Sequence, residues 1–184
     1  MTRRGQWLLV AAIVMIAAAG VWTGVMYFGA DLKRVTVGAR APDFHAVTLD
    51  SAPMSRSLAD YRGQVVLLNI WATWCPPCER EMPMLEQLYK DYAAKGLKLV
   101  AVSMDAPGME GPIRDFIKRY GLTFDVLYDA DGKIRTDYMT TGAPESFVIG
   151  KDGVIRYKQI AAINDRDAAQ IRALLDSILA ERAN

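Results

Sequence analysis

Hydrophobic and polar residues follow one another in blocks along the chain, and the longest hydrophobic block comes first. From Trp7 to Phe28 the chain runs for 22 residues without a charge. As a helix rising about 1.5 Å per residue, this segment would be roughly 33 Å long, which is enough to cross the hydrocarbon core of a bilayer. The pattern therefore predicts a transmembrane anchor at residues 7–28, preceded by a short tail at residues 1–6.

A cleaved signal peptide is the alternative interpretation of this segment. Arg3 and Arg4 form a basic start, and the three alanines at 17–19 resemble a cleavage site. The apolar run continues for nine residues beyond Ala19, which favours an uncleaved anchor. A short tail followed by one anchor favours a folded domain on the outer side of the membrane.

Shorter patterns after a predicted linker at residues 29–38 indicate one folded domain over residues 39–183. Two apolar runs rich in β-formers predict buried strands at Val65–Trp71 and Leu97–Ser103. Between these strands, hydrophobic residues recur at three- and four-residue steps. This spacing predicts a helix from Pro76 to about Lys95.

The second half of the domain continues the alternation of strands and helices. A helix is predicted from about Pro112 to Tyr120, and a strand at residues 123–127. Two strands, Ser146–Ile149 and Val154–Lys158, are predicted to form a hairpin, because the Asp-Gly between them supplies the positive φ of a tight turn. A final amphipathic helix is predicted over about residues 165–182.

The order of these elements is β-α-β-α-β-β-α, with further strands before it, and it indicates an α/β domain. Strand–helix–strand units pair their strands in parallel, so the centre of the sheet should be parallel. The terminal hairpin adds an antiparallel edge. A mixed sheet flanked by helices is therefore expected.

Charge and composition narrow the possible partners. The hydrophobic content of 52% is high for a soluble domain, and the excess lies in the N-terminal segment. Without Arg3 and Arg4 the chain holds 20 basic and 21 acidic residues, and no basic patch stands out. Nucleic-acid binding therefore has no electrostatic footprint in this sequence.

Both cysteines of the chain lie in the stretch WCPPC, as Cys75 and Cys78. Cys75 follows a predicted strand and opens a helix, where unpaired N–H groups stabilise a thiolate and lower its pKa. Pro76 and Pro77 cost nothing in a first turn, where their missing donors would have no partner. Cys75 is predicted to be the exposed attacking thiol, and Cys78 to resolve the mixed disulfide.

Two other uses of the cysteines are disfavoured. Zinc takes four ligands, and the chain has no second Cys pair and one histidine, His45, which is expected on the surface or on an edge strand. A structural staple around two residues would constrain little chain. We therefore predict a redox-active Cys75–Cys78 disulfide that needs no metal or other cofactor.

At this point a family resemblance is plain. The stretch VVLLNIWAT before WCPPC resembles the thioredoxin superfamily, and more narrowly its membrane-anchored, extracytoplasmic TlpA/ResA/DsbE-like thiol–disulfide oxidoreductases. Further stretches match in order: GARAPDF, SLADYRGQVVLLN and GAPESFVIGKDGVIRYK. The resemblance covers nearly the whole chain and implies a thioredoxin-like fold.

The resemblance also implies roles for residues around the cysteines. Pro144 falls where the superfamily has a cis-proline opposite the CxxC motif, and the backbone at Ala143 would pair with an incoming polypeptide. Pro83 matches a proline that kinks the helix. The residues expected to contact a partner are Trp74, Pro76, Pro77, Ala143, Pro144 and Glu145. Glu145 could instead tune the active site, as a second candidate acid beside Glu81. Met104 and Asp105 receive no role.

Glu81 is the candidate proton carrier. It follows Cys78 by three residues, so the two share a helix face. ResA-like proteins have a glutamate at this offset in the active site, where partial burial would raise its pKa and let it exchange protons with Cys78. A solvated surface glutamate is the alternative. Cytoplasmic thioredoxins place a buried aspartate where this chain has Asn69, which cannot titrate.

The leading functional hypothesis is a thiol–disulfide reductase, single-pass in the cell membrane through residues 7–28, with its domain on the periplasmic side. The family implies apocytochrome c as a partner and a membrane electron donor of the DsbD or CcdA type. A dithiol oxidase is the main alternative. A peroxidase and a metal chaperone of the same fold fit less well, because their motif spacings are not met.

Overall fold

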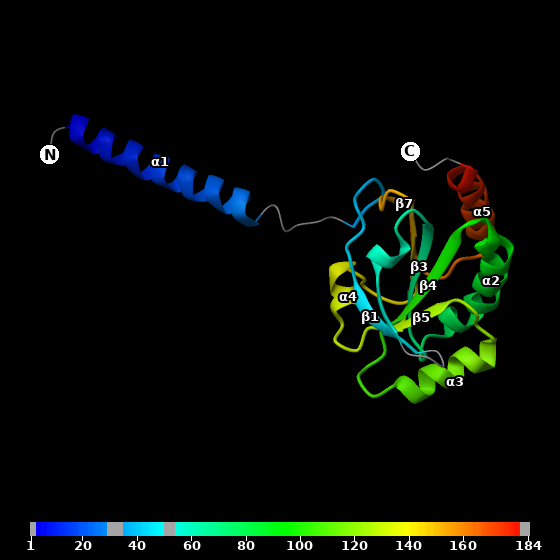
Figure 1. Cartoon of the computed structure of the whole chain (residues 1–184). Helices are drawn as coiled ribbons and strands as arrows, with labels where there is room; N and C mark the ends of the chain where they lie inside the picture. Colours follow the sequence, from blue (N-terminus) through cyan, green and yellow to red (C-terminus); the bar gives the residue numbers. More distant parts are fainter. Residues whose placement is uncertain (1–2, 29–34, 50–53, 181–184) are drawn as a thin grey trace. The chain divides into compact units, whose positions relative to one another are not determined.

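The computed structural model describes residues 3–28, 35–49 and 54–180 (Figure 1). The chain divides into two compact units after residue 34. Most of the linker predicted at residues 29–38 lies outside the described residues, as do the first two residues of the predicted tail and the predicted end of the last helix.

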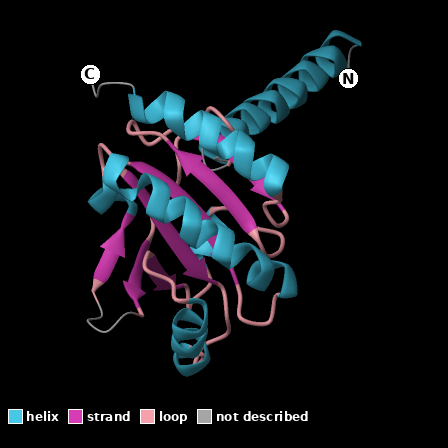
Figure 2. Ribbon diagram, turned by 90° about the vertical axis from the view of Figure 1, so that its right-hand side faces the viewer, coloured by secondary structure: helices cyan, strands magenta, loops and turns pink. Residues whose placement is uncertain are grey.

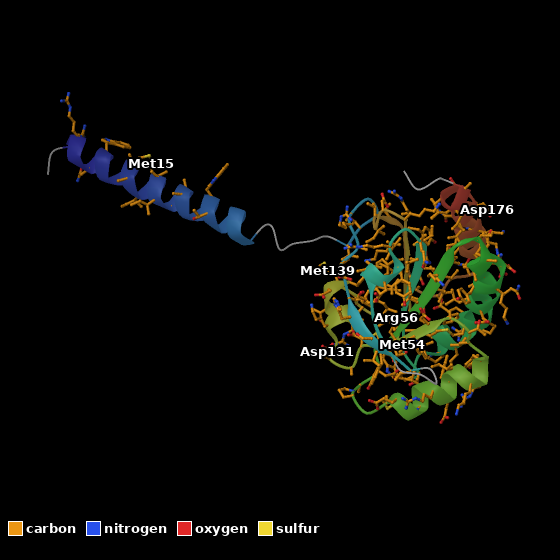
Figure 3. All side chains as sticks on the ribbon, in the orientation of Figure 1. Met15, Met54, Arg56, Asp131, Met139 and Asp176 are labelled. Atoms are coloured by element: carbon orange, nitrogen blue, oxygen red, sulfur yellow. A yellow bond between two sulfur atoms is a disulfide. The ribbon has the colours of Figure 1, made fainter. Side chains whose placement is uncertain are left out.

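The described part of the first unit is one helix, α1 (Arg3–Phe28). Its segment Arg3–Gly24 is long and apolar enough to cross a membrane, a property that anchors and signal sequences share. Large apolar side chains on it are exposed, including Trp7 and Met15, the latter labelled in Figure 3. The helix begins at Arg3, four residues before the predicted start.

Within the described part of the second unit, seven strands form one mixed sheet in the order β2-β1-β5-β4-β3-β6-β7. β3, β4 and β5 pair in parallel, while β6 and β7 add an antiparallel edge, as predicted. β1 pairs antiparallel with β5 and with β2. The bounds are β1 (His45–Thr48), β2 (Ser55–Ser57), β3 (Val65–Trp71), β4 (Leu97–Ser103), β5 (Asp125–Tyr128), β6 (Glu145–Ile149) and β7 (Ile155–Ile160).

Helices cover both faces of the sheet (Figure 2). One hydrophobic core joins the sheet to α2, α3 and α5, and a second core on the opposite face includes α4 and the segment that precedes β1. The bounds are η2 (Leu58–Tyr61), α2 (Pro76–Tyr92), η3 (Ala93–Lys95), α3 (Glu110–Tyr120), α4 (Lys133–Asp137) and α5 (Asp165–Ala180).

Strand β3 is buried along its whole length and leads directly to the cysteines. Every second side chain packs beneath α2, namely Val65, Leu67 and Trp71. Because strand side chains alternate between faces, Asn69 lies on this same face. It is a buried polar residue under the helix that carries the CxxC motif.

The structure departs from the predicted elements in a few places. α4 was not predicted, because five residues are too few to show a helical period; Asp129 stabilises its start by accepting hydrogen bonds from the backbone of Ile134 and Arg135. α3 begins at Glu110, two residues earlier than expected. β5 begins at Asp125 rather than at residue 123.

Candidate active site

Cys75 is the N-cap of α2, and Pro76 and Pro77 occupy the first helical positions, as the sequence predicts. Cys75 and Cys78 form a disulfide, with their Cα atoms 5.3 Å apart. The Cys75 Sγ accepts a hydrogen bond from the backbone N–H of Cys78 at 3.2 Å. A donor at the helix start thus points at the sulfur on which a thiolate would form.

Cys75 is less exposed than the sequence suggested. Only 3% of the residue is accessible, against 0% for Cys78. The physical reason is the loop opposite the motif: the carbonyl oxygen of Ala143 lies 3.5 Å from the Cys75 Sγ. In the disulfide this is a contact rather than a hydrogen bond, because the sulfur carries no proton.

The loop opposite the motif contains the predicted cis-proline, at the Ala143–Pro144 peptide bond. The backbone N–H of Ala161 donates to the carbonyl of Pro144 at 3.0 Å and ties the loop to the end of β7. Pro144 is buried and Ala143 is half-buried. The half-buried Ala143 therefore offers its backbone beside Cys75.

The remaining residues predicted to contact a partner differ in exposure. Trp74 is 63% exposed and Pro76 is exposed, whereas Pro77 is half-buried. Glu145 is only 1% exposed. Its carboxylate accepts hydrogen bonds from the backbone and hydroxyl of Thr141, and the Lys158 ammonium lies 3.7 Å away. Glu145 thus lies beneath the surface and contacts the loop through Thr141.

Glu81 is buried, at 2% exposure, so the alternative of a solvated surface glutamate is wrong. One carboxylate oxygen, Oε1, accepts from Asn69 Nδ2 at 2.9 Å, and the other, Oε2, accepts from the backbone N–H of Ile163 at 2.9 Å. Burial raises the pKa of Glu81 to about 7, against the lowering effect of these two hydrogen bonds. The raised pKa matches the expectation from the sequence.

Asn69 connects Glu81 to the sheet. Its Nδ2 also donates to the hydroxyl of Ser146 at 2.9 Å, across the β3–β6 pairing that sets these two residues side by side. The sequence alone indicates only that Asn69 cannot titrate. The structure shows that Asn69 donates to Glu81, the carboxylate for which a role in proton transfer was predicted.

Asp105 is a buried carboxylate for which the sequence predicts no role. It is 2% exposed and follows β4, whose last residue, Ser103, is in register with Trp71. Its oxygens accept from the backbone N–H of Thr73 (3.0 and 3.3 Å), the Thr73 hydroxyl (2.8 Å) and the Ser103 hydroxyl (2.7 Å). It fixes the segment two residues before Cys75. The signal was an acidic residue at the end of the strand that neighbours β3.

No cluster of three or more His, Cys, Asp or Glu side chains that could hold a metal occurs in the described parts of the chain. His45 begins β1 with its side chain exposed, as expected. An open cleft of about 270 Å³ lies between the start of α2 and α3, lined by Thr73, Glu79, Pro112, Asp115, Phe116 and Arg119.

Known proteins resemble this chain over most of its length. A model of the AhpC/TSA family matches residues 37–158. A thiol-disulfide oxidoreductase ResA from Geobacillus kaustophilus is 38% identical over 144 residues, 78% of this chain and 80% of the relative. One from Bacillus cereus is 35% identical over 173 residues, 93% and 96% of the two chains.

Solved structures that resemble this chain are also thiol–disulfide exchange proteins. A thiol:disulfide interchange protein of the thioredoxin family from Chlorobium tepidum matches with a TM-score of 0.62 and 27% identity, over 78% of this chain and 98% of that one. A secreted disulfide oxidoreductase from Mycobacterium tuberculosis, homologous to DsbE, matches with a TM-score of 0.61 and 26% identity, over 73% and 95% of the two chains.

Proposed function

This chain belongs to the AhpC/TSA family and is a thiol–disulfide oxidoreductase similar to ResA and DsbE, and from that premise we propose that it works as a reductase of partner disulfides. The thioredoxin-like fold predicted from the sequence is confirmed. The observation that carries the proposal is the Cys75–Cys78 disulfide at the start of α2, with a buried carboxylate one helical turn beyond it.

The reaction exchanges one disulfide for another. In the reduced protein, the Cys75 thiolate attacks one sulfur of the partner's disulfide, and the partner's other sulfur leaves as a thiolate that takes up a proton. The Cys78 thiol then loses its proton and attacks the Cys75 Sγ. The Cys75–Cys78 disulfide forms, and the partner leaves with two thiols, having gained two electrons and two protons.

Glu81 is the proposed base for the second step. It follows Cys78 by three positions on the same helix, and both side chains are buried. A carboxyl with a pKa of about 7 can accept a proton and give it up again near neutral pH. Helix position and burial therefore support Glu81 as the group that takes the Cys78 proton.

The partner binds along the loop opposite the motif. The backbone at Ala143 is available to pair with an extended segment, as in strand addition to a sheet edge. Exposed apolar surface at Trp74 and Pro76, with Pro77 beside them, would pack against the residues that flank the partner's disulfide. Pro144 shapes this loop, and Glu145 acts on it through Thr141.

The cellular setting is part of the proposal. We assign residues 7–28 as a single-pass anchor in the lipid bilayer, 29–38 as a linker and 39–183 as the catalytic domain, on the periplasmic side. The length and apolar character of α1 support the anchor. The stretch GAPESF at 142–147 supports apocytochrome c as the partner, with electrons supplied by a membrane donor of the DsbD or CcdA type.

Reduction of a partner disulfide by the full-length protein in detergent micelles tests the function. Oxidised apocytochrome c and insulin are offered to pre-reduced wild type, Cys75→Ser and Cys78→Ser. We expect two thiols released per wild-type molecule, none with Cys75→Ser, and a trapped mixed disulfide with Cys78→Ser. Equal release by wild type and Cys75→Ser contradicts the proposal.

The measured reduction potential decides the direction of electron flow. A strong dithiol oxidase of this fold has a reduction potential of roughly −120 mV, and the potential of a reductase lies well below that value. A measured potential close to that of the oxidase would show that the protein oxidises partner thiols, and it would contradict the proposed reductase activity. In cells, a Cys78→Ala variant should retain its substrate as a mixed disulfide on Cys75 and so identify it.

A further inference from the structure

Asn69 has an unusual hydrogen-bonding pattern for a residue in the middle of the core. It is 0% exposed, and its Nδ2 donates twice, to Glu81 Oε1 and to the Ser146 hydroxyl. Its Oδ1 is buried and has no hydrogen-bond partner among the described residues. A buried acceptor without a partner is rare in folded proteins and calls for an explanation.

The two donors that hold Glu81 differ in one respect. The backbone N–H of Ile163, on Oε2, can only donate. The Asn69 amide, on Oε1, carries a donor and an acceptor of nearly the same shape at its two ends. When Glu81 gains a proton, Oε2 cannot point that proton at Ile163. A proton on Oε1, by contrast, can face an acceptor if the Asn69 amide presents its Oδ1.

With Asn69 as it stands, the protonated Oε1 would meet the Nδ2 donor, and two donors repel. Turning the side-chain amide by half a turn exchanges Nδ2 for Oδ1, which then accepts the proton of Glu81. Ser146 can follow, because a hydroxyl that accepts from Nδ2 can instead donate to Oδ1. The turn keeps the carboxyl in one place whether or not it is protonated.

Neighbouring charged groups do not supply this partner. Glu145 and Lys158 interact with each other on the opposite face of the sheet, where Lys158 lies over the Phe147 ring. Asp167 of α5 accepts from the backbone of Asn164. On α2 itself the titratable neighbour is Cys78, which is the proton source in the proposed reaction.

We propose that Asn69 is a positioning residue that holds Glu81 in both protonation states by reversing its side-chain amide, with Ser146 reversing its hydrogen bond in step. This inference rests on the proposed function, in which Glu81 takes the proton of Cys78. The proton moves from the Cys78 Sγ to Glu81 Oε1, and Asn69 changes only the end of its amide that faces Glu81. Cys78 thus meets the acceptor at the same position in every cycle.

Side-chain amide NMR of the full-length protein in micelles tests the reversal. The Asn69 signals are identified by their loss in Asn69→Leu, and Glu81 is followed through its carboxyl carbon from pH 5 to 9. At high pH we expect NMR contacts between the Asn69 amide protons and the Ser146 side chain. These contacts should disappear at low pH, and the midpoint of their loss should equal the midpoint of the Glu81 titration. An Asn69 amide that keeps one orientation through that titration overturns the proposal.

Asn164 is the matched control in the same chain. Its Oδ1 accepts from the backbone N–H groups of Arg166 and Asp167 at the start of α5, so its amide is fixed by donors that cannot reverse. Its signals should not follow the Glu81 midpoint. A second arm uses Glu81→Gln, which imitates the protonated acid: Asn69 should then show the low-pH orientation at every pH, and the high-pH orientation would contradict the proposal.

The kinetic arm separates this inference from the function. We expect Ser146→Ala and Asn69→Leu to slow the release of partner by Cys78, by about tenfold or more for Asn69→Leu, with the first attack by Cys75 within about twofold of wild type. An unchanged release rate in both variants rejects the role of Asn69 in the reaction. Loss of partner reduction by the wild type itself would reject the function, while the amide titration still reports on Asn69.

Discussion

Two buried carboxylates flank the CxxC motif, Glu81 after it and Asp105 against the segment before it, and both are 2% exposed. Their hydrogen bonds differ. Asp105 accepts from the backbone and hydroxyl of Thr73 and from the hydroxyl of Ser103. Glu81 accepts from one backbone N–H and one side-chain amide.

The difference shows how one fold gives two carboxylates separate tasks. Each donor that faces a carboxylate stabilises its charged form and opposes the effect of burial. Asp105 has three donor groups and joins the end of β4 to the loop before Cys75, so it holds that loop in place. Glu81 has two, burial dominates, and its pKa is raised to about 7, which suits a group that gains and loses a proton.

Replacement of Asp105 should have the largest effect on stability. We expect Asp105→Ala to lower the free energy of unfolding by about 4 kcal/mol, because it removes charged hydrogen bonds worth roughly 1.5–3 kcal/mol each and leaves the Thr73 N–H and the Ser103 hydroxyl short of an acceptor. Urea denaturation of the oxidised protein in micelles measures it.

Asp91→Ala is the control for that variant. Asp91 forms an ion pair with Arg172 at 2.6 Å, but on the surface, with about a third of each side chain exposed. Such a surface pair contributes little to stability, because water and salt screen its charges. Similar losses for Asp105→Ala and Asp91→Ala would show that burial does not give Asp105 a special role.

Replacement of the proton carrier should instead change the pH dependence of stability. The folded pKa of Glu81, about 7, lies above the ordinary value of 4.5. The unfolded chain therefore loses its proton first, and the wild type loses stability as the pH rises from about 4.5 to about 7. The loss relative to Glu81→Gln should reach roughly 3 kcal/mol and stay constant at higher pH.

Denaturation of both proteins at pH 4.5, 6, 7 and 8.5 checks this expectation. The difference between wild type and Glu81→Gln isolates one group, because every other carboxylate is common to the two. A difference that does not change with pH would mean that Glu81 titrates alike in the folded and unfolded chains, contrary to this expectation.

Much of this arrangement was predictable from local sequence signals. β3 and β4 match their predicted bounds, because seven-residue apolar runs allow few alternatives. The cysteines at a helix start were read from the order of strand, motif and helix. The cis bond before Pro144 came from family resemblance. These features depend on neighbours in sequence or on a recognised motif.

The contacts that define the two carboxylates could not be read in this way. Asp105 meets Thr73 across 32 positions of sequence, and Ile163 meets Glu81 across 82. The residues next to either carboxylate in the sequence do not indicate that a donor from another strand or loop will contact it. The sequence predicted a role for Glu81 through its helical offset from Cys78, and it missed Asp105 because no such offset exists.

Two serines give the smallest and most selective test of the comparison. Ser103 donates to the Asp105 carboxylate at 2.7 Å, whereas Ser146 accepts from the neutral amide of Asn69. We expect Ser103→Ala to cost about 2 kcal/mol of unfolding free energy and Ser146→Ala about 1 kcal/mol, because hydrogen bonds to charged groups are stronger.

The effects of the two serine variants on the titration of Glu81 should be in the opposite order. Ser146→Ala should move the pH midpoint of the Glu81 carboxyl signal and Ser103→Ala should leave it in place, since only Ser146 shares a partner with Glu81. A shift of that midpoint by Ser103→Ala would mean that the two carboxylates form one network.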